Sequence, residues 1–437
     1  MTSNTGRQPR QSELDFDDSN VVLPSPKRVA SATIARKHLP WEGNYAAYSI
    51  EFATEAVRQL TERGKLSVLD PFVGNGTTLD AASRLGVAAS GIELNPYSAL
   101  LARCRVAVSA ERAVVRRILR DVANRAAVRL SGDYLNAAIS SILDRISRKI
   151  GSSRISAVAS ICEESGDRID SEIVALVSLL HTQRMRAHVH FRSNPAWLVR
   201  GDDPGKPLEE DPELWISAAL GATDSMLADL DLRAAFKRQR YKVFARDFRQ
   251  VHLRAGSIKR FLTSPPYLNR LDYVNPTLPA LEGLGFGSPE HVETLRQRMM
   301  GTAKMRKVAA VPSFASVTAN DFIEAVTSHP SKASGTYYRR FFCQYFSDLD
   351  EFFIWLFRVA TTDVFGMIVL QDSYYKEIKI PLAEIAIEMA QSKGFNVEVI
   401  ASETHSRHMG RINPHQSAYV PAKSLTEFVL GVRADKR

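Results

Sequence analysis

The sequence predicts an α/β fold with a doubly wound sheet, and three features support this prediction. A helical stretch at 49–64 leads into the apolar strand LSVLDPF at 66–72. A glycine-rich turn then precedes a helix, TTLDAASRLG at 77–86, and a second strand, AASGIEL at 88–94, so the chain opens with a βαβ unit. Five further strands are predicted later in the chain: YKVFARDF (241–248), KRFLTSPPY (259–267), GMIVLQDS (366–373), NVEVIASE (396–403) and EFVLGVR (427–433).

The composition fits a globular protein with a polyanionic partner. Hydrophobic residues make up 45% of the 437 residues, enough for a sizeable core. A net charge of +9 and a pI near 9.4 favour a nucleic acid, because Lys and Arg release counterions when they meet phosphates; a merely well-solvated surface is the alternative. Three widely separated cysteines form no disulfide framework, so we expect a reducing, cytoplasmic location. The lack of a signal segment or long apolar run predicts no membrane association.

Changes in composition divide the chain into regions. Residues 1–30 are polar and are predicted to form a disordered tail. Residues 31–105 and 239–437 carry the predicted sheet, and 275–335 within them form an irregular, basic insertion. Residues 106–238 are predicted to be a helical insertion, with one apolar stripe made by Val115, Ile118, Leu119, Val122 and Ala126.

The turn after the first strand has features of a nucleotide-like binding site. Gly74 and Gly76 stand between a strand and a helix, where the backbone must turn tightly and let a ligand approach. Asp70 ends the first strand, and Glu93 ends the second at a distance suited to holding ribose hydroxyls. That spacing suits a nicotinamide dinucleotide equally well, but the turn lacks the GxGxxG pattern.

The segment LDPFVGNGTTLDAASRLGVAASGIELNP (69–96) resembles motifs I and II of the DNA amino-methyltransferase family. The resemblance implies a seven-stranded, Rossmann-like methyltransferase sheet that binds S-adenosyl-methionine. It implies that Asp70, Gly74 and Gly76 line the methionine end of this cofactor, that Glu93 holds the ribose, and that Phe72 and Thr77 belong to the same pocket. Asp247 looks like the acidic residue of motif III, which accepts a hydrogen bond from the adenine amino group of the cofactor. The stretch from His38 to Phe52 contributes to the pocket on this reading, or is a plain capping helix.

The segment TSPPY (263–267) stands where the fourth strand is predicted to end. Two consecutive prolines cannot join a sheet ladder and expose rigid carbonyls, so alone the segment would be an ordinary turn. After a cofactor half of this type it is similar to motif IV of the same family. An exocyclic base amine is a poor nucleophile, and the Ser264 hydroxyl and Pro265 carbonyl can accept hydrogen bonds from it and localise its lone pair. With Pro266 fixing the loop, Tyr267 offers a face for a base flipped out of the duplex.

Two departures from the family leave DNA recognition unassigned. Motif I precedes motif IV, unlike the permuted class that DPFxGxGTT and SPPY most resemble, and the long insertion falls between motifs II and III. One candidate for DNA binding is a helix face that carries Arg112 and Arg116. The other is the basic stretch after motif IV, with Arg296, Arg298, Lys304, Arg306 and Lys307. Charged helix faces that are simply solvated are the alternative for both.

The sequence therefore predicts an enzyme that transfers a methyl group from S-adenosyl-methionine to a base amine in duplex DNA. A serine in motif IV favours cytosine N4, with adenine N6 as the alternative. Restriction–modification or phage defence, with a paired restriction endonuclease, is the setting that the family implies. Acceptors in RNA or on a glutamine side chain remain open, as do a dinucleotide-dependent oxidoreductase and a non-catalytic nucleic-acid-binding protein. His405, His408 and His415 lack a recognisable ligand spacing, so no metal is expected.

Overall fold

A computed structural model of the protein confirms the α/β class and places all seven predicted strands in one central sheet. The structure describes residues 23–26, 48–62, 64, 66–127, 134–152, 157–164, 168–186, 189–191, 198–200, 212–232, 239–268, 272–302, 304–306, 313–405 and 424–434. Most of the predicted disordered tail lies outside these ranges. Residues 23–26 are ordered against the first helix, because the Ser49 backbone N–H donates to the Pro26 carbonyl at 2.8 Å.

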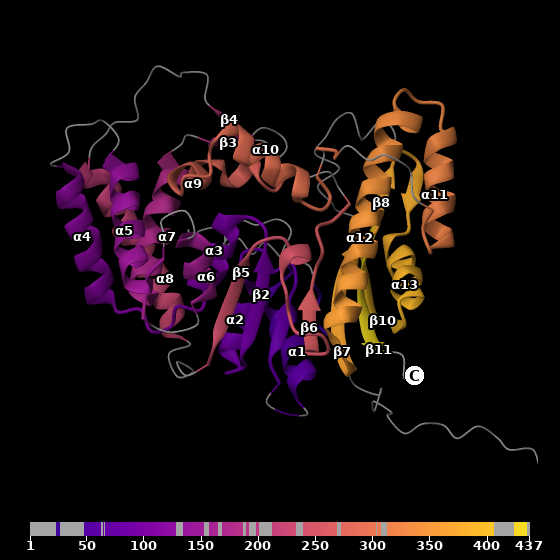
Figure 1. Ribbon diagram of the computed structural model, residues 1–437, viewed down its shortest axis with the longest axis horizontal. Coiled ribbons are helices and arrows are strands. Elements are labelled where there is room, and N and C mark those ends of the chain that lie inside the picture. Colours follow the sequence, from indigo (N-terminus) through magenta and orange to yellow (C-terminus); the bar gives the residue numbers. More distant parts are fainter. Residues whose placement is uncertain are drawn as a thin grey trace, which may run out of the picture.

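The central sheet has the spatial order β10–β11–β7–β6–β1–β2–β5 (Figure 1). Its five strands from β7 to β5 run parallel, and β11 is the one antiparallel strand, inserted between β7 and β10. The strands are β1 (Val68–Asp70), β2 (Ala89–Glu93), β5 (Tyr241–Ala245), β6 (Ile258–Thr263), β7 (Ala360–Gln371), β10 (Phe395–His405) and β11 (Leu425–Ala434). Two small hairpins lie outside the sheet, β3 (Val189–Phe191) with β4 (Leu198–Arg200), and β8 (Ser373–Tyr375) with β9 (Ile378–Ile380).

Both faces of the sheet are buried, as parallel strands require. Successive strand residues point to opposite faces, so Leu262 packs into one core and Phe261 into the other. The first core includes α1 (Ile50–Thr61), α2 (Thr77–Arg84) and α3 (Pro96–Cys104). The second includes α11 (Val317–Ser328), α12 (Arg339–Val359) and α13 (Leu382–Ser392), and it is rich in the aromatic rings of α12.

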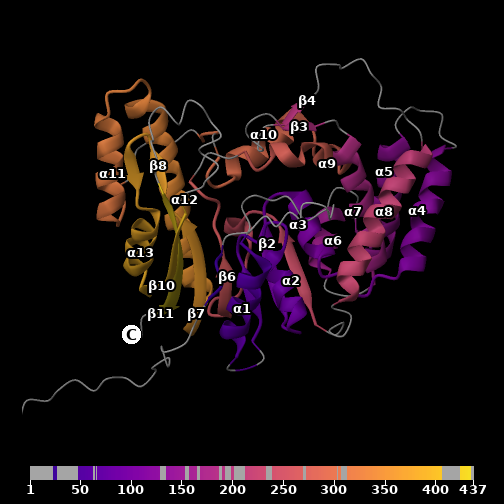
Figure 2. The ribbon, with the colours of Figure 1, turned by 180° about the vertical axis from the view of Figure 1, so that it is seen from behind.

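The predicted helical insertion packs as an extension of the first core. It contains α4 (Arg112–Ala127), α5 (Tyr134–Ile150), α6 (Ala157–Glu163), α7 (Asp170–Arg186) and α8 (Pro212–Asp231). The predicted apolar stripe of α4 is confirmed, since all five of its residues are buried. These helices lie at one end of the molecule in both views, and α11–α13 lie at the other (Figures 1 and 2). Their buried side chains are continuous with those of the sheet.

The region 275–335 is mostly helical, so the prediction of an irregular stretch is wrong. It contains η4 (Asn275–Thr277), α9 (Leu278–Gly283), α10 (Pro289–Arg298) and α11. Pro289 stands at the first turn of α10, and the Ser288 hydroxyl caps this helix by accepting from the His291 amide. The Ser288–Pro289 pair is a start signal that the sequence itself contains. In Figure 1, α9 and α10 cross above the sheet, between its two helical flanks.

Candidate active site

Four strands end at the edge of the sheet where the predicted site residues lie. The chain passes from β1 outward to β2 and β5, and then returns to β6 on the other side of β1. These strands are parallel, so their carboxyl ends share one edge. In open α/β sheets, ligands bind outside the carboxyl ends at such a reversal of strand order. Asp70, Glu93, Asp247 and Ser264 each end or follow one of the four strands.

Asp70 links several elements at the centre of this edge and is only 2% exposed. Its Oδ1 accepts hydrogen bonds from Thr263 Oγ1 at 2.7 Å and from the Phe72 amide at 3.0 Å. Its Oδ2 accepts from Tyr48 Oη at 3.1 Å and from the Thr78 hydroxyl. Burial raises the pKa of Asp70 above its ordinary value, although these donors oppose the shift. The carboxylate therefore holds β1, α2, β6 and the approach to α1 together, and its direct contact with a cofactor stays a prediction.

The glycine turn has the geometry that the sequence predicts. Gly74 and Gly76 adopt positive φ angles of 51° and 89°, which residues with a side chain rarely adopt. A Cβ on Gly76 would also lie 2.7 Å from the Ala102 Cα of α3. The turn is therefore restricted to glycine at Gly76 by both backbone conformation and packing.

Phe72 and Thr77 flank this turn and contact the protein. The Phe72 ring makes edge contacts with Phe248 and Phe352, at centroid distances of 5.4 and 5.2 Å. Thr77 begins α2, and its buried hydroxyl accepts from Arg105 Nη1 at 3.2 Å. The structure thus shows both residues stabilising the turn; neither is shown to face a ligand.

Glu93 is half-buried at the end of β2 and faces the glycine turn. Its Oε2 accepts from the Gly74 amide at 3.0 Å, and its Oε1 accepts from the Asn95 amide at 2.8 Å. Burial raises the pKa of Glu93 to about 7, and the two amides oppose the shift. An ionised carboxylate offers about four acceptor positions, so capacity remains for hydroxyl donors.

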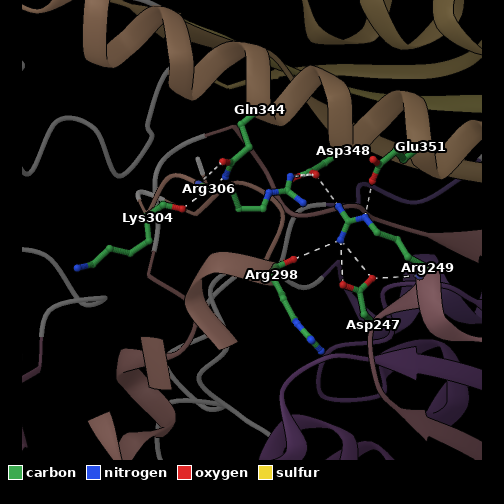
Figure 3. A network of polar contacts seen from close by, with 8 residues as sticks. All are labelled: Asp247, Arg249, Arg298, Lys304, Arg306, Gln344, Asp348 and Glu351. Carbon is green, nitrogen blue, oxygen red and sulfur yellow. Dashed lines mark hydrogen bonds and ion pairs between the residues drawn. The ribbon is translucent and has the colours of Figure 1, made fainter. Parts of the chain in front are cut away.

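Asp247 follows β5 and is engaged by a neighbouring arginine (Figure 3). Its carboxylate caps η3 (Phe248–Gln250) by accepting from the Arg249 amide at 3.0 Å. It also accepts from Arg249 Nη1, at 3.0 Å to Oδ2 and 3.2 Å to Oδ1. The same guanidinium reaches Asp348 and Glu351 on α12, each at 2.5 Å. The expected acceptor of an adenine amine is therefore already paired within the chain.

Ser264 directly follows β6 at the carboxyl edge of the sheet. The Oγ atom is buried and makes no hydrogen bond of ordinary geometry with the described residues. A side-chain interaction between this hydroxyl and the phenol of Tyr267 lowers the pKa of Tyr267, against the larger effect of burial. A buried hydroxyl without a firm partner costs about 1–3 kcal/mol, and this oxygen keeps capacity to accept a further hydrogen bond.

The loop from Pro265 to Tyr267 is anchored from two other elements. Pro265 is buried, and the Pro266 carbonyl accepts from Tyr345 Oη of α12 at 2.9 Å. Tyr267 donates its hydroxyl to Glu427 Oε1 of β11 at 2.7 Å. Burial and the nearby Glu427 carboxylate raise the pKa of Tyr267 well above its ordinary value, so the phenol stays neutral and donates. The aromatic ring is therefore held in one orientation.

The predicted basic stretch after the Ser264 loop contacts this loop, and its described members form ion pairs or polar contacts within the protein. Arg296 pairs with Asp272 at 2.9 Å, and Lys304 pairs with Glu293 at 3.4 Å. The remaining members are Arg298, whose Nη1 lies 3.5 Å from Gln250 Oε1, Arg306, which pairs with Asp348, and Lys307, which lies outside the described residues.

The other predicted DNA-binding pair lies on α4, at the far end of the molecule (Figure 1). Arg112 and Arg116 both pair with Asp224 of α8, at 2.5 and 2.6 Å. These contacts join two helices of the insertion. The structure brings neither arginine near the Ser264 loop, which follows the carboxyl end of β6.

Several residues of this edge were missed by sequence reasoning. Thr78 and Thr263 surround Asp70 together with Tyr48, which lies within the stretch 38–52 that was expected to contribute to the pocket. Tyr345 and Glu427 anchor the Ser264 loop. Glu427 could have been found, because a single acid in the apolar strand EFVLGVR is unusual. Tyr345 carries no such signal among the many aromatic residues of its helix.

Other site types find no support in the described part of the chain. Those residues contain no group of three or more side chains that could hold a metal ion. His408 and His415 lie outside the described residues. No described helix is both long and apolar enough to cross a bilayer.

Fold and site together define an open α/β protein whose polar residues gather where the strand order reverses. Comparisons with family models, with curated proteins and with solved structures find no match to this chain.

Proposed function

We propose that the protein is an S-adenosyl-methionine-dependent methyltransferase that modifies an exocyclic amine of a DNA base, with cytosine N4 as the acceptor. One observation carries the proposal. The Thr263–Asp70 hydrogen bond joins the end of β1, beside the glycine turn, to the end of β6, beside Ser264. A cofactor-type turn and an amine-binding loop are thus held within one rigid edge.

The residues at the glycine turn fit the cofactor. Glu93 keeps acceptor capacity for a ribose diol, and Gly74 and Gly76 form a turn without side chains beside it. The fit at Asp247 is poorer, because the Arg249 side chain must move away before an adenine amine can donate to this carboxylate. S-adenosyl-methionine supplies an electrophilic methyl group on its sulfonium sulfur.

The Ser264 loop fits the acceptor amine. The Ser264 hydroxyl and the Pro265 carbonyl can each accept a hydrogen bond from a base amine. Two such bonds localise the amine lone pair toward the methyl group, and in-line transfer then depends mainly on positioning. Tyr267 stacks on the flipped base, in an orientation fixed by Glu427.

Other readings are less well supported. A nicotinamide enzyme would have no use for a serine before two prolines, and the turn lacks the GxGxxG pattern of such enzymes. A non-catalytic binding protein would have no need of both a glycine turn and a Ser-Pro-Pro-Tyr loop at one edge of the sheet. The basic balance of the chain favours a polynucleotide over a glutamine side chain, and the Ser264 loop favours a single flipped base.

The test is methyl transfer from labelled S-adenosyl-methionine to mixed-sequence duplex DNA, followed by nucleoside mass spectrometry. We expect N4-methylcytosine. N6-methyladenine would correct the base alone, whereas label found only in RNA or protein would overturn the DNA proposal. No binding of S-adenosyl-homocysteine, measured by calorimetry, would overturn the methyltransferase proposal itself.

A further inference from the structure

The basic segment that follows α10 and carries Lys304 and Arg306 contacts the Ser264 loop. Gly301 adopts a φ of 73°, and a Cβ there would lie only 3.1 Å from the Tyr267 carbonyl oxygen. Gln344 of α12 clamps the next residues, because its Oε1 accepts from the Arg306 amide at 2.7 Å and its Nε2 donates to the Lys304 carbonyl at 3.5 Å. A polynucleotide that placed a base on Tyr267 would therefore bring its phosphates close to this segment.

The same segment is connected to the acid after β5 by shared ion pairs (Figure 3). The Arg306 guanidinium pairs with Asp348 Oδ1, and Arg249 donates to the same oxygen at 2.5 Å. Arg249 in turn holds Asp247 at 3.0 Å. Asp348 is 1% exposed at its side chain, so it cannot exchange either arginine for water without cost. Two guanidinium groups therefore compete for one buried carboxylate.

We propose that Asp348 is a positioning residue that couples polynucleotide binding at Arg306 to cofactor binding at Asp247. This inference rests on the proposed function. A phosphate group draws Arg306 away from Asp348. The Asp348 carboxylate, now without Arg306, attracts Arg249 more strongly. Arg249 then leaves Asp247, which becomes free to accept a hydrogen bond from the adenine amine of the cofactor.

The charges give this coupling its sign. Three carboxylates, Asp247, Asp348 and Glu351, share two guanidinium groups. Removal of Arg306 therefore leaves Arg249 as the one cation that pairs with them in the described part of the chain. Asp348 Oδ2 makes no hydrogen bond with the described residues, so it can receive the second branch of the Arg249 fork. Polynucleotide binding should therefore tighten cofactor binding, and linkage requires the reverse effect to be equal.

The ionisation of Asp348 sets the conditions for the test. Burial raises its pKa to about 6, while Arg249 and Arg306 oppose the shift. Measurements at a pH of about 8.5 keep the carboxylate ionised.

The experiment measures the affinity of the full chain for S-adenosyl-homocysteine by calorimetry, with and without a duplex of mixed sequence. We expect the duplex to tighten binding by about five-fold or more in the wild type. Arg306→Gln removes the competing guanidinium, so we expect the tight affinity without DNA and no further effect of DNA. Asp348→Asn should also abolish the coupling.

Lys304→Gln is the matched control, because Lys304 lies in the same segment but pairs with Glu293. We expect it to bind the duplex more weakly while keeping the wild-type coupling factor at saturating DNA. Equal cofactor affinity with and without DNA, or an Arg306→Gln variant that keeps the coupling, would overturn this inference alone. A protein that does not bind S-adenosyl-homocysteine would overturn both it and the proposed function.

Discussion

Thr263 Oγ1 donates a 2.7 Å hydrogen bond to Asp70 Oδ1, at adjacent strand ends that lie far apart in the sequence. Both residues are buried, so neither can replace this bond with water. The bond fixes the distance between the two halves of the candidate site. Their relative position is the quantity on which in-line transfer depends.

Thr263→Val tests this link. The substitution keeps the shape of the side chain but removes one donor from a buried carboxylate, so we expect a loss of about 1–3 kcal/mol in the free energy of unfolding. Methyl transfer should fall at saturating substrates. Thermal and urea unfolding measure the first effect. Thr361→Val, near the start of the adjacent strand β7, is the control, since the Thr361 hydroxyl donates to Ile258 O away from the site. Equal losses of methyl transfer in the two variants would contradict the proposed importance of the Thr263–Asp70 bond.

Ser264→Ala should remove an acceptor of the amine and leave the cofactor half intact. We expect methyl transfer to fall about 10²–10³-fold, the usual effect of losing one such polar contact in a transition state. Affinity for S-adenosyl-homocysteine should not change. Ser257→Ala provides the matched control, because Ser257 precedes the same strand and its hydroxyl donates to Arg254 O, away from the loop. A fully active Ser264→Ala protein would exclude Ser264 from the mechanism.

Cofactor affinity should depend on pH through Glu93. Burial raises the pKa of Glu93 to about 7, and ribose hydroxyls bind its ionised form. Affinity should therefore be constant above this pKa and weaken as the pH falls through it, approaching tenfold per unit well below about 7. Calorimetry with S-adenosyl-homocysteine between about pH 5.5 and 8.5 measures the profile. Glu93→Gln should bind weakly and lose the change in affinity near pH 7, which leaves at lower pH only the contribution of Asp348, whose pKa is about 6. An unchanged wild-type affinity down to about pH 5.5 would contradict the role of Glu93.

The ring and the hydroxyl of Tyr267 should have separable effects. Tyr267→Phe keeps the ring but leaves Glu427 without this donor, so we expect reduced stability with methyl transfer largely retained. Tyr267→Ala removes the stacking surface, worth about 1–3 kcal/mol per base, and should weaken capture of the flipped base. Fluorescence of 2-aminopurine at the target position reports base flipping. If both variants flip the base as well as the wild type, Tyr267 does not stack on it.

The sequence by itself determined the α/β class, the seven strands, the glycine turn and the position of the Ser264 loop. These features depend on local patterns: apolar strand periodicity, glycine where φ is positive, and proline where no donor is needed. The apolar stripe of α4 was predictable for the same reason.

Only the tertiary structure decided which side chains meet. Asp348 is hidden in a helix dominated by aromatic residues, and its two arginines come from segments about 42 and 99 residues away. Tyr345 and Glu427 reach the Ser264 loop from α12 and β11 in the same way. Burial and charge balance act between neighbours in space, and a linear pattern does not contain those distances. The sequence therefore indicated the residues that we propose to react, and the fold determined which side chains hold them in place.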